Sequence, residues 1–282
     1  MNDRKRAITP RVFAVLDSAK TAEPAHALPY GSRRRFLARM VASVGAFTMA
    51  GCDRLSQSEW FPKVLDSAEK LNQTLGKLVT GRKAMAQEFT AADLSPTFRS
   101  NGTAEPNNPE YAALAMNGFR DYALDVSGLV ARPRRFTLEE LRALPSRTQI
   151  TRHDCVEGWS AIGKWQGTRL SALLDAVQPS AAARYVVFHC ADPMEDDGQS
   201  PYYESIDMDD AHHEQTLLAY ALNDKPLPIA NGAPIRLRVE RQLGYKHAKY
   251  VMRLELVESF AHIGGGKGGY WEDQGYQWYA GI

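Results

Sequence analysis

The apolar positions of this chain follow two different spacings, one before and one after Pro96. Between residue 59 and about residue 92 they recur every three or four residues, which places them on one face of an α-helix. The positions that form this face are Phe61, Val64, Leu65, Ala68, Leu71, Leu75 and Leu78. We therefore expect a helical segment, residues 53–94, before the main body of the chain.

Beyond Pro96 the apolar residues gather in short runs that turn residues separate, a pattern typical of β-strands. The clearest runs are 122–127, 185–190, 234–239 and 250–257. Short helices are predicted at 137–143, at 169–176 and near 211–221, where leucine and alanine repeat at helical spacing. Because these elements do not alternate as regular β-α-β units, the predicted fold class is α+β, with one strand-rich domain over residues 95–282. The aromatic tail 270–279 is expected to pack on the surface of this domain and has no predicted role.

The charges of the chain are nearly balanced, with 34 Lys+Arg against 33 Asp+Glu in 282 residues and a formal net charge of +1. Such a chain has no overall basic field that would favour a nucleic acid, so any anion site has to be local. The three cysteines, Cys52, Cys155 and Cys190, form neither a CxxC pair nor a zinc-ligand spacing. This spacing excludes a disulfide framework, and a single bridge between Cys155 and Cys190 stays open as an alternative.

Residues 1–52 have the features of an export signal. Ser32-Arg33-Arg34-Arg35-Phe36-Leu37 places paired arginines before a weakly apolar stretch. That stretch has about eleven residues, fewer than the roughly twenty that a membrane-spanning helix needs. Thr48-Met49-Ala50-Gly51-Cys52 resembles a lipobox, which implies a lipid anchor at Cys52. We expect export to the periplasm by the twin-arginine route, which carries folded proteins that often hold a cofactor; the alternative is a basic amphipathic helix of a cytosolic protein.

Cys155 lies in a polar segment, Arg152-His153-Asp154-Cys155-Val156-Glu157-Gly158-Trp159-Ser160. Cationic neighbours stabilise a thiolate, which is both a good nucleophile and a good ligand for a soft metal. Asp154 and Glu157 act on the pKa of the thiol in the opposite direction, which favours metal ligation over free nucleophilicity. Arg152, His153 and Glu157 are candidates for the substrate pocket or for proton delivery, and a structural hydrogen-bonding role is the alternative for each.

A second polar segment, residues 231–249, collects cations. If its first half is a strand, Arg236, Arg238 and Glu240 share one face of it. Lys246, His247 and Lys249 follow in a short loop after Gly244. Guanidinium, ammonium and backbone N–H groups that converge in this way suit a phosphate. The alternative is that the two arginines only pair with carboxylates such as Glu240.

Together the two segments resemble the molybdopterin-binding domain that sulfite oxidases share with the catalytic subunit of periplasmic methionine sulfoxide reductase. Cys155-Val-Glu-Gly-Trp-Ser160, followed by Trp165, Gly167 and Leu170, resembles the ligand-cysteine motif of that family. Asn231-Gly-Ala-Pro-Ile-Arg236 resembles its NGAPLR signature. The resemblance covers residues 95 to about 260 and implies a sulfite-oxidase-type fold.

The resemblance also implies a cofactor, Mo-molybdopterin, whose metal is ligated by Cys155. Asn231 and Arg236 would contact the pterin, and His247, Ala248 and Lys249 would form the loop around its phosphate. Asn101 stands where relatives place cofactor-binding asparagines. The implied activity is that of a molybdenum-dependent oxidoreductase that transfers an oxygen atom; the protein fixes the ligand geometry and lines the substrate pocket.

The residues after the cysteine reduce the number of candidate substrate classes. Sulfite oxidases have Ala-Gly-Asn-Arg there, whereas Val156-Glu157-Gly158-Trp159 of this chain is nearer to the reductase branch. A methionine sulfoxide reductase catalytic subunit proper is therefore one alternative, although His153-Asp154 departs from the pattern of that branch. The substrate is then a small-molecule or protein sulfoxide. With no CxxCH haem motif in the sequence, a separate electron-transfer partner is expected, such as a cytochrome or a membrane quinone protein.

Two further interpretations come from other functional classes. The first is a metal-free cysteine hydrolase that uses Cys155 with His153, His189 or His247 as base. The second is a lipid-anchored binding protein of the cell envelope, which would hold the cofactor without turnover.

Overall fold

The structure is a computed structural model that describes residues 84–195 and 200–282, together with Ser58, Trp60, Val64, Ser67, Ala68, Leu71 and Gly81. The chain divides into two units, Met1–Ser67 and Ala68–Ile282. The expected export signal and Cys52 lie outside the described residues. Within the segment expected to be helical, Val64, Ser67, Ala68 and Leu71 are helical. Residues 84–90 are extended instead, and Glu88 forms a β-bridge with Thr151, so the apolar spacing overestimated the length of the helix.

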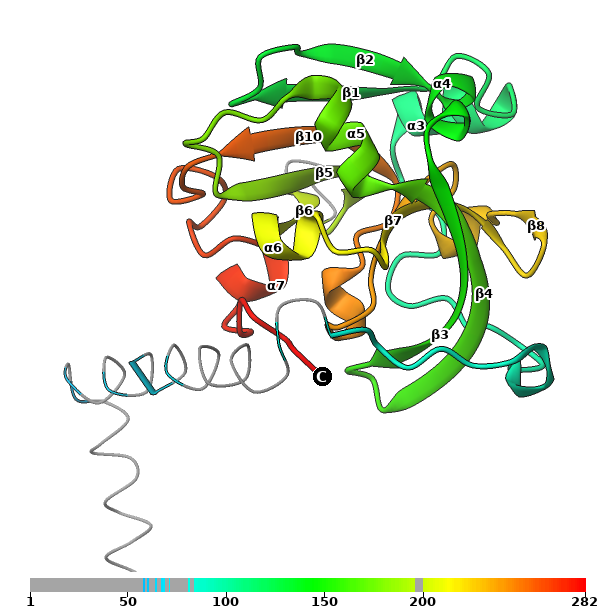
Figure 1. Cartoon of the computed structure of the whole chain (residues 1–282), viewed down its shortest axis with the longest axis horizontal. Coiled ribbons are helices and arrows are strands. Elements are labelled where there is room, and N and C mark those ends of the chain that lie inside the picture. The colour runs from blue at the N-terminus through cyan, green and yellow to red at the C-terminus, as the bar shows by residue number, and fades with distance from the viewer. Residues whose placement is uncertain are drawn as a thin grey trace, which may run out of the picture. The chain divides into compact units, whose positions relative to one another are not determined.

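The larger unit contains two five-stranded sheets (Figure 1). The first has the order β2-β1-β10-β5-β6, with strands Arg134–Thr137, Ala123–Gly128, Val251–Val257, Tyr185–Pro193 and Pro201–Asp207. β1 and β10 are parallel, and the other neighbouring pairs are antiparallel. The predicted runs 122–127, 185–190 and 250–257 are its three inner strands; β5 is buried along most of its length, whereas buried and less buried positions alternate in β1.

The second sheet has the order β3-β4-β7-β8, and β9 also pairs with β7. Its strands are Ser146–Cys155, Trp159–Arg169, Thr216–Leu222, Lys225–Pro226 and Arg236–Val239. The helix predicted near 211–221 was wrong, because Leu217, Leu218 and Ala219 form ladder pairs with β4 on one side and β9 on the other. Only its first residue is helical, as the end of α6 (Met208–Ala211).

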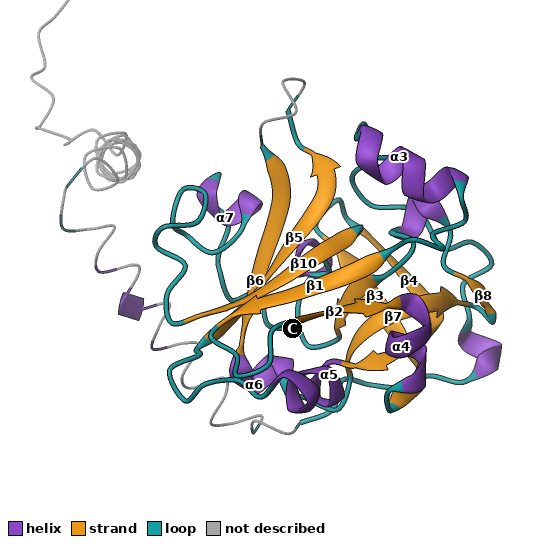
Figure 2. Ribbon diagram, turned by 90° about the horizontal axis from the view of Figure 1, so that it is seen from above, coloured by secondary structure: helices purple, strands orange, loops and turns teal. Residues whose placement is uncertain are grey.

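The helices lie over the outside of the strands (Figure 2). They are α3 (Pro109–Met116), α4 (Leu138–Ala143), α5 (Leu170–Val177), α6 and α7 (Tyr270–Asp273), with 3₁₀ turns η1 (Ala91–Asp93), η2 (Ile229–Asn231) and η3 (Gly244–Lys246). The predictions at 137–143 and 169–176 are confirmed by α4 and α5. α4 begins with a capping box between Thr137 and Glu140, which satisfies two free N–H groups at the helix start.

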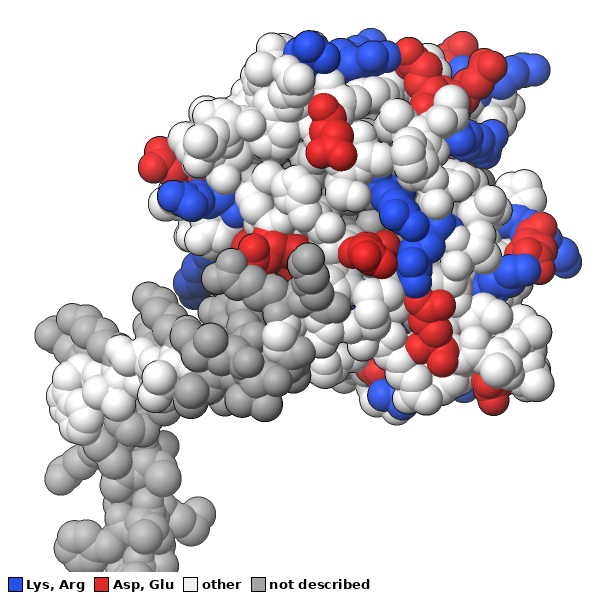
Figure 3. Space-filling model, in the orientation of Figure 1, with Lys and Arg blue, Asp and Glu red and all other residues white. Residues whose placement is uncertain are grey.

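The main apolar core joins both sheets and α5. It contains Phe188 and Leu254 from the first sheet, Leu218 and Leu237 from the second, and Leu173 from the helix. On the face shown in Figure 3, acidic and basic side chains are interspersed. Among the described residues, no helix is both long enough and apolar enough to span a membrane.

Candidate active site

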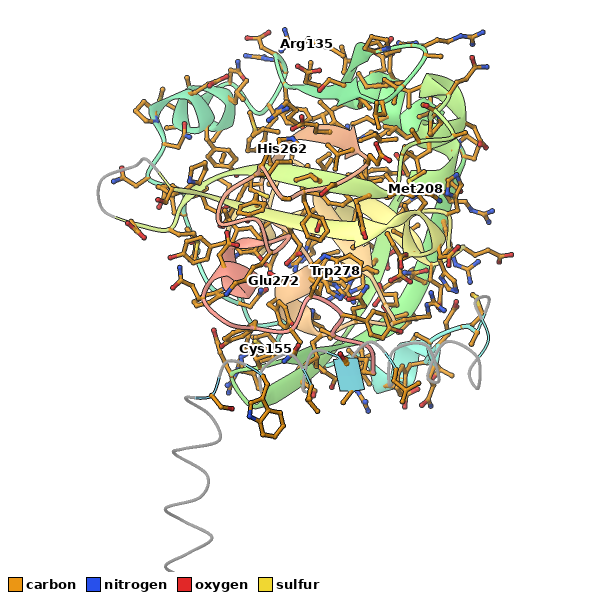
Figure 4. The ribbon with its side chains drawn as sticks, turned by 90° about the vertical axis from the view of Figure 1, so that its left-hand side faces the viewer. Arg135, Cys155, Met208, His262, Glu272 and Trp278 are labelled. Atoms are coloured by element: carbon orange, nitrogen blue, oxygen red, sulfur yellow. The ribbon has the colours of Figure 1, made fainter. Side chains whose placement is uncertain are left out.

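Cys155 lies at the tip of a long hairpin. It is the last residue of β3 and faces Trp159, the first residue of β4. The turn between them closes with a hydrogen bond from Gly158 N to Cys155 O (3.1 Å), and Gly158 has φ +84°, which favours glycine. The thiol is therefore held at the end of two paired strands, where it is half-buried rather than enclosed in the apolar core. Figure 4 marks its position at the lower end of the domain.

A pocket of about 520 Å³, including its open mouth, lies next to Cys155. Four of the predicted site residues line it together: Asn101, Cys155, His247 and Lys249. They come from segments of the chain that are far apart in sequence, as the family resemblance requires. The other three, Asn231, Arg236 and Ala248, are buried and are not among the residues that line the pocket.

Arg236 is a fully buried cation without an ion pair among the described residues. Its guanidinium donates only to backbone carbonyls, Asn231 O and His247 O, each at 3.1 Å. Its Nε has no hydrogen-bond partner. Burial and the nearby Arg238 lower the pKa of Arg236 to about 9. The site therefore contains an unbalanced positive charge, which is costly unless an anion is bound.

Arg238 has the opposite environment, although it lies two residues further along the same strand face. Its guanidinium donates to both oxygens of Glu240, at 2.9 and 2.5 Å. It also donates to His153 Nδ1 at 3.0 Å. The carboxylate pairing that the sequence offered as an alternative holds for Arg238, whereas Arg236 has no carboxylate partner among the described residues.

Lys249 is the second unbalanced cation of the site. Its Nζ donates to the carbonyl of Thr103 and, at 3.1 Å, to that of Ala230. Burial and Arg236 lower the pKa of Lys249 to about 7, and Asp192 opposes this shift. A lysine in this state gains its full charge readily when an anion binds next to it.

Two histidines, His247 in the pocket wall and the buried His153, are neutral. His153 Nδ1 accepts from Arg238, so the proton of its ring is on Nε2, and His153 itself does not line the pocket. His247 Nε2 faces the carbonyl of Gln242 at 3.0 Å, which leaves Nδ1 as an acceptor with no partner. Burial and Arg238 hold the pKa of both rings well below the usual range. Of the roles that the sequence offered for His153, the structure shows the structural hydrogen bond, because the ring accepts from Arg238 and does not line the pocket.

Several residues of the pocket wall were not predicted from the sequence. Asp192, at the end of β5, lines it with a buried carboxylate whose Oδ1 has no partner. Burial raises the pKa of Asp192 to about 6. A polar residue directly after an inner apolar strand was the available signal for it. Tyr202, Tyr245 and Trp271 also line the pocket, and Trp271 comes from the aromatic tail that had been given no role.

Two cysteine alternatives are settled by the geometry. Cys155 and Cys190 are both free thiols, so the bridge between them is not formed. Burial raises the pKa of the Cys155 thiol, which is the opposite of what a hydrolase nucleophile needs. The hydrogen bonds of the described histidines go to Arg238, Glu255 and backbone groups, and none goes to Cys155.

This combination of a hairpin cysteine, a pocket and uncompensated cations agrees with a comparison against known families. Residues 112–262 match the family described as "Oxidoreductase molybdopterin binding domain". The chain belongs to this family. It is therefore a molybdopterin-dependent oxidoreductase, with Mo-molybdopterin as its cofactor, and its strand-rich α+β fold is that of the sulfite-oxidase type.

Its relatives carry related names. A protein of Azospira oryzae with the provisional name protein-methionine-sulfoxide reductase subunit YedZ1 is 37% identical over 250 residues, which cover 89% of this chain and 88% of that protein. The protein-methionine-sulfoxide reductase catalytic subunit MsrP of Xanthomonas campestris pv. campestris is 32% identical over 237 residues, 81% of this chain and 71% of MsrP. Among solved structures, the sulfane dehydrogenase SoxCD from Paracoccus pantotrophus has a TM-score of 0.45 and 25% identity, over 50% of this chain and 39% of that chain.

The site of this molybdopterin-family member fits the chemistry of its cofactor. Arg236 and Lys249 supply positive charge for a phosphate. Asn101 Oδ1 and His247 Nδ1 are buried acceptors without partners, and nearly all buried polar atoms of native proteins are hydrogen-bonded. A ligand with an anionic group at one end and N–H donors at the other would pair with these cations and hydrogen-bond to these acceptors.

Sulfate should bind the cofactor-free protein more tightly about one pH unit below 7 than about one unit above it. The pKa of Lys249 is about 7, so the ammonium carries its charge on the acidic side and the folded protein holds it neutral on the basic side, whereas sulfate keeps the same charge throughout. Isothermal titration calorimetry measures the difference. Lys249→Arg should bind at both pH values, because arginine stays charged, and Lys249→Met should bind weakly at both. Equal affinity of the unmodified protein at the two pH values would contradict the assignment.

Proposed function

We propose that this chain is the catalytic subunit of a sulfoxide reductase. The observation that carries this proposal is the charge of the pocket wall beside Cys155. Glu157 and Asp192 line it, and Lys249 is the single lysine or arginine that does so among the described residues. Lys249 is already engaged by two backbone carbonyls. In this proposal the phosphate of the cofactor neutralises Lys249, so the charged groups that remain in the wall are the carboxyl groups of Glu157 and Asp192, which disfavour an anion such as sulfite and admit a neutral sulfoxide. The names of the relatives support the same substrate class.

In this proposal Cys155 Sγ ligates the molybdenum. Asn101, Asn231 and Arg236 hold the pterin, and residues 247–249, His247 to Lys249, surround its phosphate. When bound, the cofactor supplies two-electron oxygen-atom exchange. Because burial raises the pKa of the thiol, Cys155 is protonated in the cofactor-free protein and releases its proton when the metal binds. The overall reaction takes a sulfoxide, two electrons and two protons to a sulfide and water.

We further propose that the electrons come from a separate redox protein, a cytochrome or a membrane quinone protein, and that the enzyme works in the periplasm. The relatives' names include the word subunit, which supports a partner. The paired arginines of residues 33–35 support export by the twin-arginine route, with Cys52 as the point of a lipid anchor. Cell fractionation of an Arg34→Lys, Arg35→Lys variant tests the route: the protein should then stay in the cytoplasm.

The substrate is tested by comparing two reactions of the purified holoenzyme. Dimethyl sulfoxide and a peptide that contains methionine sulfoxide are reduced with reduced benzyl viologen as donor, and sulfite is oxidised with ferricyanide as acceptor. We expect kcat/KM for a sulfoxide to exceed that for sulfite by more than about tenfold, the discrimination that one unfavourable polar contact produces. Faster sulfite oxidation would contradict the proposal. If the protein contains a full complement of cofactor and turns over neither substrate, the result would favour the interpretation as a binding protein of the cell envelope.

A further inference from the structure

Three charged residues form a cluster in the interior beside the pocket. Lys246 Nζ lies 2.5 Å from Glu204 Oε1 and 2.6 Å from Glu272 Oε1. None of the three side chains is more than 1% exposed. They come from η3, β6 and α7, and Figure 4 marks Glu272 within the domain. A buried ion pair of this kind contributes little net stability but is costly to break, so it fixes the segments that carry it.

Each member of the cluster is joined to the pocket wall through at most two residues of chain. The wall residues are Tyr202, two positions before Glu204, Tyr245 and His247 on either side of Lys246, and Trp271 directly before Glu272. Three segments that are distant in sequence are therefore held in register at the point where each contributes a side chain to the pocket.

Glu204 is tied to its surroundings by several hydrogen bonds. Its Oε1 accepts from Lys246 Nζ and, at 2.7 Å, from Ser205 N. The Tyr202 hydroxyl donates to the carbonyl of Tyr245 at 2.5 Å and makes a longer contact of 3.3 Å with Glu204 Oε2. Burial raises the pKa of Glu204 well above its usual range, although Lys246 opposes this. Glu272 has fewer partners among the described residues: its Oε1 accepts from Lys246 Nζ and its Oε2 has none, so Lys246 is the contact that holds the Glu272 side chain.

The ring of Trp271 is enclosed by other aromatic groups. It lies 5.3 Å from the ring of Tyr276, at 32°, and 5.4 Å from that of Tyr270, at 83°. Tyr276 contacts Tyr245 edge to face at 5.2 Å. An indole face in the wall offers apolar contact to the carbon substituents of a sulfoxide and none of the charge that an anion would require.

We propose that the Lys246–Glu272 ion pair is a positioning device that sets Trp271 in the pocket wall, and that Trp271 selects the substrate through its apolar face. This proposal rests on the proposed function, because it takes the pocket as the sulfoxide site. The tail that contains α7 is then part of the active site rather than a surface covering.

A double-mutant cycle tests whether Glu272 acts through Trp271. Glu272→Gln and Trp271→Ala are each expected to raise KM for dimethyl sulfoxide by about five- to tenfold, with kcat and molybdenum content little changed, because both remove binding that is the same in ground and transition states. The double variant should be no worse than Trp271→Ala, since coupled residues are not additive. Additive effects, or a loss of molybdenum in Trp271→Ala, would overturn the proposal.

A second measurement does not depend on turnover. The acrylamide quenching of Trp271, obtained as the difference between the holoenzyme and its Trp271→Phe variant, should increase in the Glu272→Gln background. The matched control is Glu258→Gln, the same substitution at an exposed carboxyl group, for which quenching and KM should stay near the original values. If Glu258→Gln has the effect of Glu272→Gln, the positioning role is wrong.

The two measurements distinguish a failure of the proposed sulfoxide reductase function from a failure of the positioning role of Glu272. A holoenzyme that reduces no sulfoxide would end the proposed function, while the quenching comparison would still decide whether Glu272 positions Trp271. If Glu272→Gln does not fold, the paired change Lys246→Met with Glu272→Leu removes both charges at once, a replacement that buried ion pairs often tolerate. Quenching of Trp271 that is unchanged in that variant would overturn the positioning role.

Discussion

The Cys155→Ala variant is expected to fold, to contain no molybdenum and to lose its activity. Cys155 ends a paired strand and is half-buried at the hairpin tip, so alanine leaves no large cavity. Mutation of a residue that only hydrogen-bonds to a metal ligand typically lowers metal affinity or activity about 10- to 100-fold. Removal of the proposed ligand itself should therefore lower kcat/KM by more than about 100-fold. Elemental analysis and sulfoxide reduction with reduced benzyl viologen measure the two effects.

Cys190→Ala is the matched control for this experiment. Cys190 is also a free thiol, but it is buried in the apolar core and does not line the pocket. Its replacement should lower stability by about 1 kcal/mol, since it removes one small buried group, and should leave the molybdenum content unchanged. A Cys155→Ala protein that kept its molybdenum and its turnover would refute the proposed ligand.

Arg236→Met and Arg238→Met should have opposite consequences, although the two arginines share one face of β9. In the cofactor-free protein, Arg236→Met removes an unpaired buried charge but also the hydrogen bonds to two backbone carbonyls. These effects offset each other, so stability should stay within about 2 kcal/mol of the original. Cofactor affinity should fall by about 10- to 100-fold, the effect of a charge-assisted hydrogen bond of about 1.5–3 kcal/mol.

Arg238→Met leaves Glu240 buried without its partner, because both of its oxygens accept from that guanidinium. The loss of one member of a buried pair costs about 3–5 kcal/mol, so this variant should unfold at a clearly lower urea concentration. Urea denaturation of the cofactor-free proteins measures the stability of each variant, and titration with isolated cofactor measures its cofactor affinity. Equal losses of stability in the two variants would show that Arg236 is not held for an anion.

Three of the four runs that the sequence predicted as strands are inner strands of one sheet, β1, β5 and β10, and the fourth, 234–239, contains β9 of the other sheet. β5 is buried along most of its length, whereas β1 alternates between buried and less buried positions, and both patterns are visible without any tertiary information. β3 was missed because its most buried positions, Gln149, Thr151 and His153, are polar. Their burial depends on partners such as Arg238 and Glu240, which are more than eighty residues away in the chain. A hydrophobic pattern cannot show a strand whose buried face is a hydrogen-bonded network.

The error at β7 has a different cause. Leu217, Leu218 and Ala219 have good helical propensity, and their spacing is compatible with a helix. Pairing with strands on both sides supplies hydrogen bonds and burial that exceed this preference. The preference of a short segment is worth a few tenths of a kcal/mol per residue, so tertiary contacts decide its structure.

Residue identity and order along the chain were enough to predict the family, the fold class and the residues of the two motifs. Which of the two arginines on one strand face lacks a carboxylate partner could be seen only in the folded chain, since it depends on where the carboxylate of Glu240 lies. The tertiary structure likewise placed Asp192 and Trp271 in the pocket wall. Charge balance in a buried site depends on every group within a few ångströms, and those groups come from segments whose approach no local pattern records.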